Sequence, residues 1–87
     1  LALAKEVSDR HGEMAALNNL GLAYKAVGQL EQTVFYEEQS LAIAQELRDR
    51  QIEEQILKNL GNACYALGNY AQAVIYYEQR LTLAQEM

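Results

Sequence analysis

The chain has 87 residues and a formal net charge of −5, which disfavours nucleic acid and anionic membranes as partners because both attract basic patches. Its one cysteine, Cys64, excludes an internal disulfide and a cysteine-based metal cluster. No apolar run reaches the roughly 18–20 residues of a membrane span, so we expect a soluble protein of the cytoplasm.

A stretch of ten residues occurs twice in the chain. Residues 19–28 read NLGLAYKAVG and residues 59–68 read NLGNACYALG, an offset of 40 residues. Periods of roughly 20–50 residues are typical of repeat arrays. We therefore expect a single domain over residues 1–87. Its expected parts are the tail helix of a preceding repeat at 1–10, a first full repeat at 11–50 and a second repeat at 51–87.

The spacing of the apolar residues predicts about five helices. The first ends near residue 8, and a turn follows at residues 9–12. Asp9 is expected to cap the next helix there, and Asp49 is expected to do the same in the second copy. The other four helices are expected at about 12–27, 30–47, 51–67 and 70–87. Gly28 and Gly68 lie just past helix ends, where a left-handed residue stops a helix. Without proline or strand-like alternation, the chain should be all-α, with at least about 75% helix.

Two apolar stripes and two glycines predict how these helices pack. The stripes repeat every three or four residues and should face the core. They consist of Met14, Leu17, Leu20, Tyr24 and Val27 in one helix and Tyr70, Ala73, Val74, Tyr77, Leu81 and Ala84 in the last. Gly21 and Gly61 lie on or beside the inward face of their helices. Glycine inside a helix costs roughly 1 kcal/mol relative to alanine, so their return at one full period indicates a close approach of the paired helix.

The second copy resembles the tetratricopeptide repeat. The resemblance rests on Leu60-Gly61, Gly68-Asn69-Tyr70, Ala73 and Tyr77, and in the first copy Leu30, Thr33 and Glu37 depart from the pattern. The proline that ends the standard unit is missing, and a helical extension at residues 42–50 takes its place. This long unit is similar to those of Pins-type adaptors and of cyanobacterial repeat proteins. The resemblance implies an α-solenoid of antiparallel helix pairs that binds a peptide or a helix of a partner protein in a concave groove.

The resemblance also implies which residues line that groove. They lie on the first helix of each pair, away from its apolar stripe: Asn18, Asn19, Leu22, Lys25, Lys58, Asn59, Asn62 and Tyr65. Amide side chains both donate and accept hydrogen bonds, so they can pair with the backbone of an extended peptide. The alternative is that these amides bond within the helices or to water. Lys58 and Asn62 resemble one arm of a carboxylate clamp, but the further cations of a clamp are missing.

Neither an active site nor a cofactor site is predicted. His11 has no second histidine or cysteine near it, and the carboxylate pairs Glu37-Glu38 and Glu53-Glu54 have no histidine base or phosphate loop beside them. Cys64 stands where the first copy has Tyr24 and is expected to be buried and inert. A non-enzymatic protein is therefore expected. The alternative to a binding scaffold is a structural spacer in a longer array.

Uncovered apolar residues at the two ends predict self-association of the isolated chain through its end helices. Leu1, Leu3 and Val7 should lack a covering helix at one end, and Leu83 and Met87 at the other. A repeat buries its apolar face only by stacking on neighbours. The expected partners are thus a protein or peptide and further copies of the chain, with no nucleic acid and no membrane.

Overall fold

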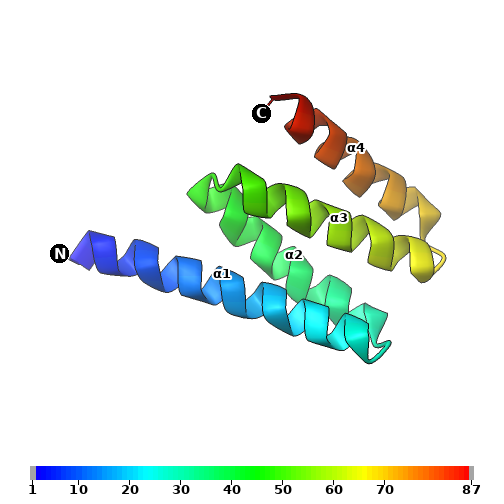
Figure 1. The fold of residues 1–87 in the computed structure, drawn as a ribbon, viewed down its shortest axis with the longest axis horizontal. Coiled ribbons are helices and arrows are strands. Elements are labelled where there is room, and N and C mark those ends of the chain that lie inside the picture. Colours follow the sequence, from blue (N-terminus) through cyan, green and yellow to red (C-terminus); the bar gives the residue numbers. More distant parts are fainter. Residues whose placement is uncertain (1, 87) are drawn as a thin grey trace.

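The computed structural model describes the backbone of residues 2–86 and the side chains of residues 8–86. The fold consists of α1 (Ala2–Ala26), α2 (Leu30–Leu47), α3 (Arg50–Ala66) and α4 (Tyr70–Glu86) (Figure 1). These helices have 25, 18, 17 and 17 residues, so they hold 77 of the 87 residues, and the described backbone contains no strand. The all-α prediction is confirmed. No helix in this part of the chain is long and apolar enough to cross a membrane.

The structure has four helices where about five were predicted, because the turn expected at residues 9–12 does not form. Asp9, His11 and Gly12 lie inside α1, so residues 2–10 continue into the helix that was expected to begin at residue 12. The equivalent turn between α2 and α3 does form, with Arg48 left-handed at φ 55° and the Asp49 carboxylate accepting a hydrogen bond from the N–H of Ile52 (3.3 Å).

Tertiary packing accounts for the turn at residues 48–49 and the continuous helix at residues 9–12. The turn at residues 48–49 lets α3 pack back against α2. Across residues 9–12 the backbone continues as helix instead, and helix propagation there gains one hydrogen bond for each residue added. The capping role predicted for Asp49 is confirmed and that for Asp9 is wrong. The repeat boundaries at 11–50 and 51–87 stay a prediction.

Each helix packs against the next one along the chain. α1 and α3 run in one direction and α2 and α4 run back, so the chain forms two antiparallel pairs, with α3 also packed on α2 (Figure 1). Gly28 and Gly68 end the first helix of each pair with φ of 81° and 83°, as predicted. The N–H groups of the next residues, Gln29 and Asn69, then bond back to the carbonyls of Tyr24 and Cys64 (2.9 Å each).

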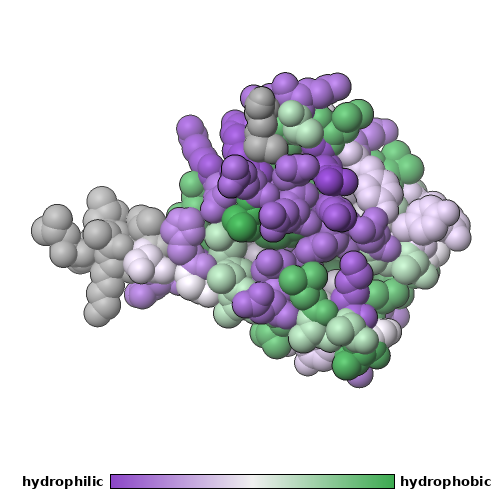
Figure 2. All heavy atoms as spheres, viewed as in Figure 1, coloured by the Kyte–Doolittle hydropathy of each residue, from purple (hydrophilic) through white to green (hydrophobic). Residues whose placement is uncertain are grey.

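The core lies along α3 and the faces of the helices that meet it. Its buried members come from all four helices: Met14, Leu41, Ile43, Ala44, Ile56, Leu57, Leu60, Cys64, Ala73, Tyr76 and Leu83. Part of each predicted stripe is exposed instead, namely Leu20, Val27, Tyr70, Val74, Leu81 and Ala84. Spacing had shown that these faces are apolar but could not show whether a neighbouring helix covers them. Exposed hydrophobic side chains gather toward the end at which α1 joins α2 and α3 joins α4 (Figure 2).

The residues expected to lack cover at the chain ends are only partly described. Leu83 is buried in the core, which contradicts the prediction that it lacks cover. The side chains of Leu1, Leu3, Val7 and Met87 lie outside the described residues.

The two helices of each pair approach closely at a glycine. A Cβ atom added to Gly21 would lie 2.7 Å from Cγ of Glu37, and one added to Gly61 would overlap the ring of Tyr77, 2.6 Å from its Cδ1. In the first pair two hydroxyls tighten this contact, because buried Thr33 donates to the carbonyl of Gly21 and buried Ser40 to that of Met14 (2.9 Å each). The predicted reason for the two glycines is confirmed.

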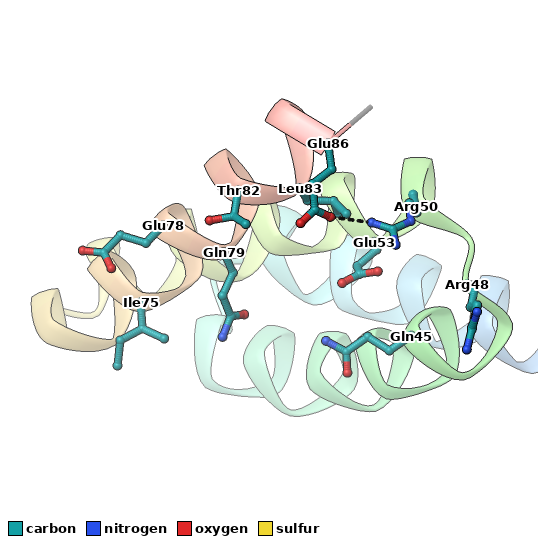
Figure 3. A pocket seen from close by; sticks show the side chains of 10 residues that line it. All are labelled: Gln45, Arg48, Arg50, Glu53, Ile75, Glu78, Gln79, Thr82, Leu83 and Glu86. Carbon is teal, nitrogen blue, oxygen red and sulfur yellow. Dashed lines mark hydrogen bonds and ion pairs between the residues drawn. The ribbon is translucent and has the colours of Figure 1, made fainter.

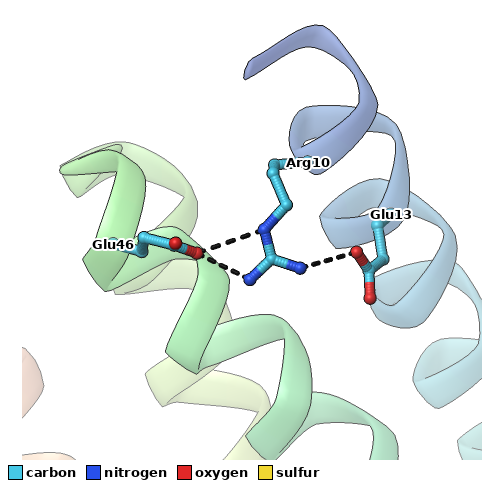
Figure 4. A network of polar contacts seen from close by, with 3 residues as sticks. All are labelled: Arg10, Glu13 and Glu46. Carbon is cyan, nitrogen blue, oxygen red and sulfur yellow. Dashed lines mark hydrogen bonds and ion pairs between the residues drawn. The ribbon is translucent and has the colours of Figure 1, made fainter. Parts of the chain in front are cut away.

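An ion pair joins the helices of each pair at the other end. Arg10 lies between Glu46 and Glu13, with Nη atoms 2.6 and 2.7 Å from their carboxylates (Figure 4). One period later Arg50 pairs with Glu86 at 2.7 Å. Exposed pairs of this kind contribute only about 0–1 kcal/mol, so they mark the repeat more than they stabilise it.

Replacing Gly61 with alanine tests the close approach. Gly61→Ala should lower the free energy of unfolding by about 1–3 kcal/mol, because the added methyl group displaces the Tyr77 ring. Gly12→Ala is the matched control, since nothing lies within 4 Å of its Cβ position, and it should stabilise by about 0.5–1 kcal/mol through helix propensity. Urea unfolding followed by circular dichroism measures both. A Gly61→Ala protein as stable as the control would show that the helices have room to spare.

Candidate functional site

A buried carboxylate joins three of the four helices. Glu37 of α2 is fully buried, and its Oε2 accepts a hydrogen bond from the amide of Asn59 in α3 (3.0 Å). From α1, the amide nitrogen of Asn18, in the orientation that satisfies both groups, donates to Oε1 and Oε2 at 2.9 and 3.0 Å. Gly21 leaves the space that the Glu37 side chain fills. The carboxylate of Glu37 therefore connects α1 with α3.

Burial has the largest effect on the pKa of the Glu37 carboxyl. It raises the pKa of Glu37 from 4.5 to about 7, although the hydrogen bond from Asn59 and the positive charge of Lys25 both act to lower it. An amide can serve either protonation state. Asn18 donates its N–H to the ionised carboxylate, and after a flip its carbonyl oxygen can accept the proton of the neutral acid. The carboxyl can therefore titrate near neutral pH while it stays paired.

The second copy uses a different residue at the same place. Tyr77 is the equivalent of Glu37 and fills the space beside Gly61. Its hydroxyl donates to the Oδ1 of Asn62 in α3 (2.6 Å). The two helix pairs thus share a geometry, but the first holds a titratable carboxyl where the second holds a phenol.

The structure separates the eight residues predicted for the groove into two sets. Five are exposed: Asn19, Leu22, Lys25, Lys58 and Tyr65. Three are half-buried amides with partners inside the fold: Asn18 and Asn59 at Glu37, and Asn62 at Tyr77. The hydrogen bonds of these three amides run between neighbouring helices, rather than within one helix. Whether any of the eight contacts a partner stays a prediction.

Six of the eight form two equivalent rows, here called the α1–α3 strip. They are Asn18, Leu22 and Lys25 on α1 and Lys58, Asn62 and Tyr65 on α3. Spacings of four and three residues place each row on one face of its helix. The strip contains two of the three lysines of the chain and no acidic residue of its own. It is a basic surface, with two cations and no carboxylate, in a protein of net charge −5.

Sequence reasoning missed the central position of Glu37. The available signal was the departure from the repeat pattern, because a glutamate stands where the second copy has Tyr77, at an inward-facing position. A charged residue at an inward-facing position needs partners from neighbouring helices. Asn18 and Asn59 are those partners, and they had been assigned to the groove instead.

Two hollows on the described surface have well-defined linings. One of about 370 Å³ is apolar and lies between the end of α3 and the start of α4, lined by Tyr65, Tyr70, Ala73, Val74 and Tyr77. The other, of about 670 Å³, is lined by α2, α3, α4 and the α2–α3 turn, and its mostly polar side chains include the Arg50–Glu86 pair (Figure 3). Two arginines and three glutamates line the larger hollow, so its charge favours no single class of ligand.

The remaining chemically active side chains do not come together. Within the part of the chain that the structure describes, no three of the histidine, cysteine, aspartate and glutamate side chains are grouped so that they could hold a metal ion. Cys64 is buried, as predicted, and burial raises the pKa of its thiol. His11 is exposed on α1 rather than in a turn. Glu38 accepts a hydrogen bond from buried Tyr76 (2.9 Å), whose pKa is raised by burial and then by this bond.

Antiparallel helix pairs, each with a close contact at glycine and a left-handed glycine at its turn, define a helical repeat scaffold. The family model for the tetratricopeptide repeat matches residues 13–86, and the chain belongs to that family. Tetratricopeptide repeats are non-enzymatic scaffolds that generally mediate contacts between proteins. No curated protein matches the chain.

Titration of Glu37 should make the stability of the protein depend on pH. Between the unfolded pKa of 4.5 and the folded pKa of about 7, the folded state binds the proton more tightly. The contribution is therefore complete below pH 4.5 and is lost as the pH rises through 7. We expect unfolding at pH 8 to require less free energy than at pH 5, by more than about 1 kcal/mol.

The variant Glu37→Gln isolates this effect. It should flatten the profile between pH 5 and 8 and be more stable than the wild type at pH 8, because glutamine is neutral throughout. Glu31→Gln removes an exposed carboxylate from the same helix and should leave the profile unchanged. Urea unfolding at a series of pH values measures all three proteins. Parallel profiles for Glu37→Gln and the wild type would assign the pH dependence to other groups.

Proposed function

We propose that this protein is an interaction scaffold whose α1–α3 strip holds a peptide or a helix of a partner protein. The observation that carries the proposal is the strip itself, with two equivalent rows of polar and apolar side chains on α1 and α3 at one full period. Binding on the first helices of successive pairs is how repeat arrays of this kind form extended surfaces.

The strip offers contacts suited to a polypeptide. Lys25 and Lys58 are exposed cations, so they favour a partner with carboxylates near its contact residues. Leu22 and Tyr65 are exposed apolar or aromatic anchors, and Tyr65 is 61% exposed. Tyrosine is enriched among the residues that dominate binding energies. The amides of Asn18 and Asn62 are held in place by Glu37 and Tyr77, which lowers the entropy that a partner must remove.

The proposal extends to the setting of the protein. Its unit resembles the long repeats of Pins-type adaptors and of cyanobacterial repeat proteins, and we place it with such adaptors in the cytoplasm. A lone buried thiol at Cys64 is compatible with a reducing compartment. In this setting the two repeats, at 11–50 and 51–87, act as one binding unit within an α-solenoid.

The second candidate function is a spacer that only joins neighbouring repeats. The larger exposed apolar faces favour it, because Val74 and Leu81 of α4 are exposed and suit packing on another helix. A spacer requires no ligand on the strip. The two functions therefore differ in what happens when the strip is changed.

Selection of short random peptides displayed on phage tests the strip. The wild type should enrich peptides that share a motif. The triple variant Leu22→Ala, Lys58→Ala and Tyr65→Ala should bind these peptides at least about tenfold more weakly, because it removes both anchors and one cation. Binding is measured by fluorescence anisotropy of the enriched peptides.

A matched variant controls for general effects of truncation. Phe35→Ala, Arg48→Ala and Ile75→Ala remove an exposed aromatic, cationic and aliphatic side chain outside the strip and should leave binding unchanged. Equal affinity of the strip variant and the wild type would exclude the strip as the binding surface. Failure to enrich any peptide motif would favour the spacer.

A further inference from the structure

Two exposed apolar faces lie at opposite ends of the helix array. The α4 end face consists of Tyr70, Val74, Leu81 and Ala84, and the α1 end face consists of Ala16, Leu20 and Ala23. All seven side chains are exposed, and none is charged. The α1 end face lies on the side of α1 away from the strip, whereas Tyr70 of the α4 end face borders the strip, with its ring centroid 5.1 Å from that of Tyr65.

The α4 end face has a buried counterpart in the first copy. Its equivalents on α2 are Leu30, Val34, Leu41 and Ala44, which are half-buried or buried. Leu41 is 8% exposed, whereas its equivalent Leu81 is 60% exposed. α3 packs on α2, and within residues 2–86 no helix follows α4.

The α1 end face has a buried counterpart in the second copy. Its equivalents on α3 are Ile56, Leu60 and Ala63, all of which are buried. Leu60 is completely buried, whereas its equivalent Leu20 is 43% exposed. α3 packs on the preceding helix α2, and no helix precedes α1 among the described residues. The two end faces therefore correspond to the two sides of the α2–α3 joint.

We propose that the α4 end face of one copy binds the α1 end face of a second copy, in the arrangement that α3 adopts on α2. The occupant follows from the molecule itself, because the α2–α3 joint shows which surface fits a face of this kind. The apolar hollow of about 370 Å³, lined partly by Tyr70 and Val74, receives side chains of the incoming α1.

Charge and polar contacts agree with this occupant. The one buried carboxyl at the α2–α3 joint is Glu37, and its equivalent in the joint between copies is the uncharged Tyr77. Asn19 of the incoming copy takes the place of Asn59 beside it. The hydrogen bond from Tyr76 to Glu38 between α4 and α2 also has an equivalent pair, because Tyr36 of the incoming copy corresponds to Tyr76, and Glu78 corresponds to Glu38.

This contact uses different surfaces on the two copies, so every copy keeps one free face of each kind. Such heterologous contacts continue into open chains unless a rotation closes them. The proposal goes beyond binding on the strip, and it specifies the order in which copies join. It also replaces the expectation that Leu83 takes part, since Leu83 is buried within its own copy.

Sedimentation velocity on a dilution series of the 87-residue chain tests the proposal. The average mass of the wild type should rise with concentration and pass the mass of two copies. Leu20→Glu and Leu81→Glu should each weaken self-association at least about tenfold, because each introduces a charge into one face. An equimolar mixture of these two variants should form a one-to-one complex that stops at two copies, since each variant retains the face that the other lacks.

Two control variants carry the same added charge outside the end faces. Ala15→Glu and Ala71→Glu change exposed residues whose equivalents, Gln55 and Glu31, are also exposed, so neither should alter the mass distribution. Circular dichroism verifies that each variant folds. If Leu20→Glu or Leu81→Glu does not fold, Ala16→Glu and Val74→Glu take their places.

Three outcomes would overturn the proposal. The first is a wild type that stays monomeric at high micromolar concentration. The second is a Leu20→Glu protein that still dimerises, which would indicate a symmetric contact between two α4 end faces. The third is a mixture of Leu20→Glu and Leu81→Glu that forms no complex.

Discussion

The arrangement of the molecule depends on the close contact between paired helices at Gly21 and Gly61. At each glycine the missing side chain leaves room for one large residue of the partner helix, Glu37 or Tyr77. That residue reaches past the glycine toward the side on which α1 and α3 carry their amides. The same contact that packs a pair therefore also fixes the side chains of Asn18 and Asn62, so packing and the candidate site share one origin.

The difference between Glu37 and Tyr77 shows how one geometry supports two chemistries. Tyr77 offers a single hydroxyl, which Asn62 satisfies, and its ring buries apolar surface. Glu37 requires two amides from two helices, and as a buried carboxylate it is a weak source of stability. Glu37 of α2 instead connects α1 with α3, because each of these helices contributes one amide to its carboxyl group. The Glu37 carboxyl also titrates near neutral pH, so the hydrogen bonds that hold the side chains of Asn18 and Asn59 depend on its protonation state.

Local chemistry predicted most of the fold. The all-α class, the left-handed Gly28 and Gly68 and the cap at Asp49 all depend on residues close in sequence, and the structure confirms them. Asp-Arg at residues 49–50 begins a helix, whereas the same pair at 9–10 lies within one, because the turn requires a helix packed on each side. The site was harder to predict for the same reason. The bond from Asn59 to Glu37 spans 22 residues and three helices meet there, so no local pattern contains it.

The two proposed surfaces can act together because they lie on different sides of α1. The strip uses Leu22 and Lys25 of α1, whereas the end face uses Leu20 and Ala23. If copies join as α3 joins α2, the row on the incoming α1 continues the rows of the copy before it at the spacing of the repeat. A partner long enough to contact rows on two copies would then bind the second row at a high effective concentration, and its affinity would exceed that for one copy without any new type of contact. Stacking of copies would in this way set the length of partner that the strip selects.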